Sequence, residues 1–112
     1  MASANCLITG NMCGGNGALS GVGAGIHVTG QANRIEANNV ANNTRGIEAS
    51  AGATRNFIVR NTARTNEVNY AIVAGNRIAQ IVVPAVNTAD ISTTSGSADG
   101  FTNVDPWANF SY

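Results

Sequence analysis

An internal repeat limits the fold of this chain more than any other feature of its sequence. The motif Asn-x-Ile-x-x-Asn occupies residues 33–38 and returns 23 residues later at 56–61. A shorter copy begins at Asn76, and a degenerate copy around Ile8 precedes the series. A period of roughly 20 to 50 residues indicates a solenoid, in which each repeat buries its apolar face only by stacking on the next.

A second pattern lies between the copies of the first. Gly25–Val28 recurs as Gly46–Ala49 and, more loosely, as Ala71–Ala74. We therefore expect two short strands in each repeat and two inward ladders of aliphatic side chains. The first ladder would contain Ile8, Ile35, Ile58 and Ile78, and the second Ile26, Ile47 and Ile72.

The abundance of asparagine supports a coil with tight corners. The chain has sixteen Asn and thirteen Gly residues, which disfavour helix interiors. We expect Asn11, Asn38 and Asn61 at equivalent corners, where Asn tolerates a left-handed backbone and its carboxamide bonds to the Asn one turn away. A leucine-rich repeat is excluded because Leu7 and Leu19 are the only leucines.

Together these features resemble a known family. Gly25–Gly30, the Asn-x-Ile-x-x-Asn copies and the ending Asp105–Tyr112 are similar to the Asn-rich bacterial type of right-handed parallel β-helix repeat proteins in the pectin-lyase-like superfamily. The resemblance covers roughly residues 5 to 112 and is to the C-terminal portion of a longer member. It implies an all-β, single-stranded parallel β-helix. Because members include polysaccharide lyases, hydrolases, epimerases and proteins without known activity, it leaves the function open.

The β-helix is expected to have about three to four turns, in three segments. Residues 1–24 would form a degenerate first turn and a Gly-rich loop, and residues 25–92 the regular turns. Residues 93–112 would be a polar linker and an aromatic cap, in which Trp107, Phe110 and Tyr112 fold over the last turn.

Charge and length exclude several kinds of partner. Six Arg balance six acidic residues, there is no Lys, and no apolar stretch approaches the length needed to span a membrane. We therefore expect no nucleic-acid or membrane partner. No secretory signal is visible at the N-terminus, whereas the family resemblance points to an extracellular or periplasmic location, so the compartment stays open.

No catalytic residue, metal or other cofactor is expected. The lyases and hydrolases of this fold, as the resemblance implies, use clustered carboxylates. Here the acidic residues are scattered along the chain, at Glu36, Glu48, Glu67, Asp90, Asp99 and Asp105. A zinc site needs four ligands, and His27 is the only histidine.

Four residues are candidate ligand contacts. His27 and Glu48 hold the same position on successive turns and should point outward about 4.8 Å apart. They form either a site or a solvent-exposed ion pair of little energetic value. Arg34 and Glu36 flank the inward Ile35, and outward polar side chains of this kind bond to sugar hydroxyls.

Three apolar residues are expected to point outward: Leu7, Phe57 and Val59. They form either a protein interface or a platform for stacking sugars, and the absence of Trp and Tyr among them favours the interface. We therefore expect a homo-oligomer, most simply a dimer, because three to four turns bury little apolar surface and the first turn exposes strand edges. Cys6 and Cys13 either pair or lie as two small buried side chains.

The sequence thus predicts a noncatalytic β-helix module that acts by binding or self-assembly. The alternative is a carbohydrate-binding domain or a vestigial polysaccharide-active one.

Overall fold

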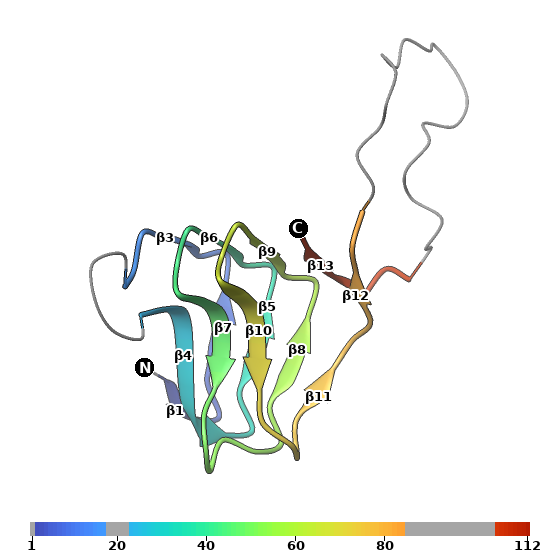
Figure 1. The fold of residues 1–112 in the computed structure, drawn as a ribbon. Coiled ribbons are helices and arrows are strands. Elements are labelled where there is room, and N and C mark those ends of the chain that lie inside the picture. The colour runs from blue at the N-terminus through green and yellow to red at the C-terminus, as the bar shows by residue number, and fades with distance from the viewer. Residues whose placement is uncertain (1, 18–22, 85–104) are drawn as a thin grey trace, which may run out of the picture.

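A computed structural model describes residues 2–17, 23–84 and 105–112. Those residues form thirteen strands and no helix, so none of the described segments is a helix that could cross a membrane. Every strand pair is parallel, and the chain coils through four turns of a parallel β-helix (Figure 1). The fold predicted from the repeat is confirmed.

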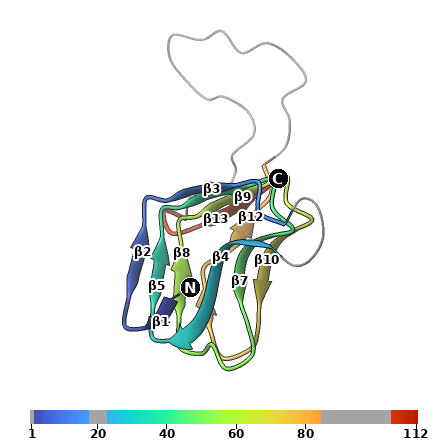
Figure 2. The same cartoon turned by 90° about the vertical axis from the view of Figure 1, so that its left-hand side faces the viewer.

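Three sheets run along the coil, and Figure 2 shows sheet C across the top with sheets A and B on the two other sides. Sheet A contains β1 (Ala2–Ala4), β4 (Ala24–Gln31), β7 (Arg45–Ala49) and β10 (Val68–Ile72). Sheet B contains β2 (Leu7–Thr9), β5 (Arg34–Glu36), β8 (Phe57–Val59) and β11 (Arg77–Ile78). Sheet C contains β3 (Met12–Gly14), β6 (Asn39–Ala41), β9 (Thr62–Arg64), β12 (Ile81–Val82) and β13 (Asn109–Ser111).

Each turn therefore has three strands, and the expectation of two was wrong. The strand that the sequence concealed lies in sheet C, directly after the second Asn of the motif. It is only three residues long, and its central residue changes from Cys13 to Val40 to Ala63 on successive turns. One inward residue of variable type gives no alternation of apolar and polar positions, which is the usual signal of a strand.

The interior is filled by the predicted aliphatic ladders, with one change of register. Ile8 pairs with Ile35 and Ile35 with Ile58, and the last two are completely buried. In sheet A, Ile26 pairs with Ile47, but the next residue in that ladder is Tyr70 and not Ile72. The shift is two residues, and side chains alternate with period two, so Ile72 still packs against the core.

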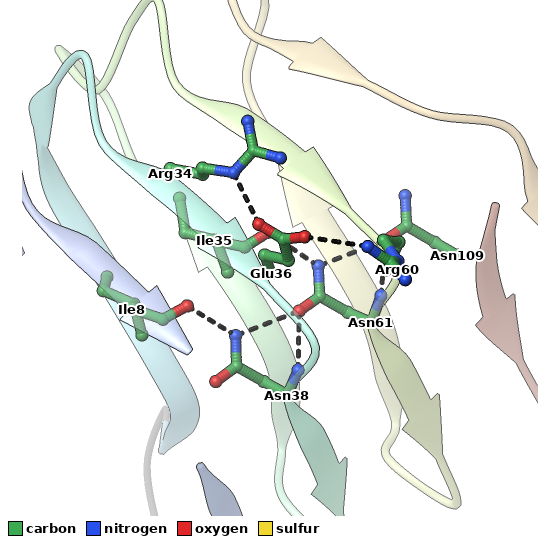
Figure 3. A network of polar contacts seen from close by, with 8 residues as sticks. All are labelled: Ile8, Arg34, Ile35, Glu36, Asn38, Arg60, Asn61 and Asn109. Atoms are coloured by element: carbon green, nitrogen blue, oxygen red, sulfur yellow. Dashed lines mark hydrogen bonds and ion pairs between the residues drawn. The ribbon is translucent and has the colours of Figure 1, made fainter. Parts of the chain in front are cut away.

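Asparagine ladders close the corners between the sheets. At the corner between sheets B and C, the side-chain oxygen of Asn61 accepts hydrogen bonds from the backbone N–H and the side-chain amide of Asn38, at 3.1 and 3.0 Å. Asn38 offers the same acceptor to Asn11. The Asn38 amide also donates to the Ile8 carbonyl (Figure 3). Asn33, Asn56 and Asn76 repeat this arrangement at the corner between sheets A and B, and Asn16, Asn43 and Asn66 at the third corner.

The left-handed backbone was expected at the ladder asparagines, and that expectation was wrong. The positive φ angles belong to the residue before each one, such as Ala37 before Asn38 (φ 55°) and Arg60 before Asn61 (φ 57°). One left-handed residue turns the chain through the corner, and the following Asn is then free to stack its carboxamide. Gly10 and Gly75 fill the same place before Asn11 and Asn76, where glycine adopts this conformation without strain.

The C-terminal segment does not fold over the last turn as the predicted cap. Residues 93–104 of that segment lie outside the described ranges, and residues 105–112 enter sheet C. There β13 lies between β9 and β12, parallel to both. Asn109 is completely buried and continues the ladder of Asn61, whose backbone N–H and amide donate to the Asn109 side-chain oxygen at 3.0 and 3.1 Å.

The ladder of sheet B provides a stability test with an internal control. Ile58→Ala should lower the free energy of unfolding by about 2 to 5 kcal/mol, because the stacked core cannot close around the gap. Ile78, the next residue of the same ladder, is 38% exposed, so Ile78→Ala should cost less than about 1.5 kcal/mol. Urea denaturation measures both, and equal small losses would show that Ile58 is not a core residue.

Candidate functional site

The outer face of sheet B collects alternating apolar and cationic side chains. Leu7, Arg34, Phe57 and Arg77 are successive partners across β2, β5, β8 and β11. Partners in a parallel sheet point to the same side about 4.8 Å apart, so the four side chains form one row. Leu7, Phe57 and Arg77 are exposed, and Arg34 is partly exposed.

Glu36 lies between two guanidinium groups on this face. Its carboxylate accepts a hydrogen bond from Arg34 Nε and another, at 3.3 Å, from Arg60 Nη1 (Figure 3). The bond from Arg34, together with the positive charges of both arginines, holds the pKa of Glu36 below its usual value, and the same bond raises the pKa of Arg34. The carboxylate therefore stays ionised and does not serve as a proton donor near neutral pH.

Two aromatic rings stack against these arginines. The Arg34 guanidinium carbon lies 5.0 Å from the centre of the Phe57 ring and 6.0 Å from that of Trp107, and the Arg60 carbon lies 5.3 Å from the Trp107 ring centre. These are cation–π distances. We call Arg34, Glu36, Phe57, Arg60 and Trp107 the arginine–aromatic cluster.

The C-terminal segment holds Trp107 in the cluster. The Asp105 carboxylate accepts a hydrogen bond from the Trp107 backbone N–H at 3.0 Å, and the Trp107 carbonyl accepts one from the Arg60 N–H at 3.1 Å. Ala108 and Asn109, the next two residues, are buried. The indole is thus fixed on the surface while remaining 46% exposed.

The sequence identified only part of this cluster. Arg34 and Glu36 were predicted as ligand contacts, and the structure brings them together. Arg60 and Trp107 were missed: Arg60 occupies a corner position that holds Ala37 one turn earlier, and Trp107 belongs to a segment far away in the sequence. No repeat pattern reports a contact of that kind.

The predicted apolar interface is only partly exposed. Leu7 is 63% exposed and Phe57 is exposed, but Val59 is 1% exposed and cannot belong to an open surface, so its assignment was wrong. Arg60, the residue after Val59, donates its backbone N–H to the Trp107 carbonyl, so the C-terminal segment passes this end of β8. Whether Leu7 and Phe57 contact another copy stays a prediction.

His27 and Glu48 are neighbours on sheet A, as their positions in the repeat predicted. His27 Nε2 lies 4.0 Å from the Glu48 carboxylate and 3.1 Å from Ser50 Oγ. Glu48 is not the solvent-exposed partner that was expected: it is 8% exposed, and Arg45 on the same strand forms an ion pair with it. The carboxylate is committed to this local pair.

Neither expectation for the two cysteines is fully met. Both thiols are free, so the proposed pair is not formed. Cys13 packs against the core as the alternative predicted, whereas Cys6, at the corner between β1 and β2, is exposed. Cys6 Sγ donates to the Ala4 carbonyl at 3.3 Å.

Replacing His27 tests whether the pair with Glu48 contributes to stability. The His27 side chain is 40% exposed, and Arg45 remains to neutralise Glu48, so His27→Ala should change the free energy of unfolding by less than about 0.5 kcal/mol. Thermal and urea unfolding check this. A loss above about 1.5 kcal/mol would mean that the imidazole is a structural part of sheet A.

Comparison with known proteins identifies one family. Residues 1–96 match the NosD family, described as periplasmic copper-binding protein (NosD). No curated protein matches the chain, and no solved structure does. The match ends before β13 and Trp107.

The described residues do not fit a copper site of the kind that the family description implies. Copper in proteins is held mainly by His, Cys and Met side chains. Here His27 bonds to Ser50 on sheet A, Cys13 faces the core, and Met12 is exposed on sheet C. Within the three described ranges, no group of three or more His, Cys, Asp or Glu side chains lies close enough to hold a metal ion.

The family match nevertheless covers residues 1–96, which include all four described turns of the β-helix. This chain belongs to the NosD family.

Proposed function

We propose that the protein is a noncatalytic β-helix module that binds an acidic saccharide on the outer face of sheet B. The observation that carries this proposal is the arginine–aromatic cluster, in which Arg34 and Arg60 stack on exposed rings. Guanidinium groups bind carboxylates through paired hydrogen bonds, and exposed aromatic rings offer flat apolar surface to a sugar ring.

The charge of this face supports an anionic ligand. Arg34, Arg60 and Arg77 provide three positive charges here, against two carboxylates, that of Glu36 and that of Asp105 beside Trp107. Arg77 lies beside Phe57 in the exposed row and has no acidic partner among the described residues. A neutral glycan has no carboxylate that could pair with the unneutralised arginine.

Three features support binding without catalysis. Glu36 is held ionised between two arginines, so it is a poor general acid. Glycoside hydrolysis needs a second carboxylate about 5 to 10 Å away. Among the described acidic residues, Glu48 is paired with Arg45 on sheet A, and Glu67 lies between β9 and β10, outside sheet B. Asp105 bonds to the Trp107 backbone and thereby has a positioning role.

The test is calorimetric titration with an oligomer of galacturonic acid and with a neutral glucose oligomer of equal length. The acidic oligomer should bind, and rising salt should weaken the binding. Trp107→Ala should raise the Kd at least about tenfold, a loss of about 1.4 kcal/mol. Tyr112→Ala is the matched control, because Tyr112 is an exposed aromatic on the same segment outside the cluster, and its Kd should not change.

Equal affinity for the neutral and acidic oligomers would contradict the role given to the arginines. An unchanged Kd in Trp107→Ala would contradict the location of the site. Arg60→Gln provides a second variant, because it removes one guanidinium and leaves the ion pair between Arg34 and Glu36 in place.

A further inference from the structure

We infer that sheet C contains a strand-acceptor site between β9 and β12, and that two copies of this chain associate by exchanging β13 through it. The site takes an extended segment that carries Asn at the ladder position. This inference is independent of the proposed saccharide site, since it rests on strand pairing and not on the surface of sheet B.

The first observation is an interrupted sheet. In sheets A and B, the strand of the fourth turn pairs directly with that of the third: β10 with β7, and β11 with β8. In sheet C, β12 does not reach β9, because β13 lies between them. Thr62 pairs with Phe110, and Phe110 pairs with Val82, so the fourth turn is displaced by one strand.

The second observation explains why a strand is needed there. The residues that precede Thr62, Phe110 and Val82 are Asn61, Asn109 and Ile81. In the fourth turn, the ladder position is therefore occupied by Ile81. The isoleucine side chain has no acceptor, and direct pairing would leave the Asn61 backbone N–H and side-chain amide without the oxygen that the Asn109 side chain supplies. A buried donor without a partner is strongly destabilising.

The site also recognises the rest of the segment. The Asn109 amide donates to the carbonyls of Ile58 and Ala79, and so joins the third turn to the fourth. Tyr70 Oη donates to the Phe110 carbonyl at 2.8 Å, and the Asn69 amide donates to Ser111 Oγ at 2.8 Å. Recognition therefore combines a buried Asn with main-chain pairing, and such pairing gives affinity wherever a peptide adds a strand to a sheet.

A second copy of the chain is the partner that fits. Each copy carries both the acceptor site and the strand, so reciprocal exchange keeps every contact of β13 and closes a two-fold dimer. Twenty-six residues separate Val82 from Asn109 in the sequence, a length that spans up to roughly 85 Å when extended. Neither the pairing nor the length of the connection restricts β13 to its own chain.

Disulfide trapping in the full-length chain tests the exchange. One protein carries Thr62→Cys and the other Phe110→Cys, both with Cys6→Ser and Cys13→Ala, and the two are refolded together at high concentration and oxidised. Partners on adjacent parallel strands lie at a spacing that a disulfide can bridge. We expect a disulfide-linked heterodimer at least about five times above that formed by the control pair, Thr9→Cys with Phe110→Cys.

A single chain with both Thr62→Cys and Phe110→Cys, oxidised at high dilution, is the positive control and should form an internal disulfide. If it does, and the mixed proteins link only at the control level, β13 stays in its own chain and the exchange is refuted. Failure of the internal disulfide would refute the acceptor site itself. Adding Asn109→Leu to the Phe110→Cys chain should reduce the heterodimer to the control level, and an unchanged yield would refute the role of the ladder Asn.

Discussion

The structure depends on one repeated interaction, in which a buried Asn oxygen accepts both the backbone N–H and the side-chain amide of the Asn one turn below. It solves the main difficulty of a coil with sharp corners, where the backbone leaves its sheets and its polar groups lose their strand partners. Asn38 and Asn61 show the arrangement fully, because their amides also donate to the carbonyls of Ile8 and Ile35. Among the described residues, no buried side-chain nitrogen or oxygen lacks a partner.

The same interaction connects the fold to the surface that we propose as a binding site. The fourth turn has Ile81 where the ladder requires Asn, so the ladder is continued by Asn109 from the C-terminal segment. Trp107 is two residues before Asn109, so the insertion of β13 brings the indole to Arg60 and Arg34. The position of Trp107 in the arginine–aromatic cluster is thus a consequence of the way in which Asn109 continues the ladder.

The sequence allowed the coil, the inward isoleucines of sheet B and the stacking of Asn11, Asn38 and Asn61 to be predicted, because each repeats at the spacing of one turn. It did not reveal the third strand of each turn or the register of Tyr70, where the inward residue changes type. Nor did it reveal the contacts of Trp107 or the burial of Val59. The contacts of Trp107 follow from the pairing of the adjacent β13 with β9, which joins residues 48 positions apart and is not part of the repeat.

The free energies of unfolding of Asn61→Ala and Asn11→Ala measure how far the coil depends on the buried part of the Asn ladder. Asn61 is completely buried and bonds to Asn38, Ile35 and Asn109, so its loss leaves several polar groups without partners. Asn11 is exposed at the first turn and donates to Asn38 alone within the ladder. We expect a loss above about 2 kcal/mol for Asn61→Ala and below about 1 kcal/mol for Asn11→Ala. Small and equal losses would show that the coil does not depend on these hydrogen bonds.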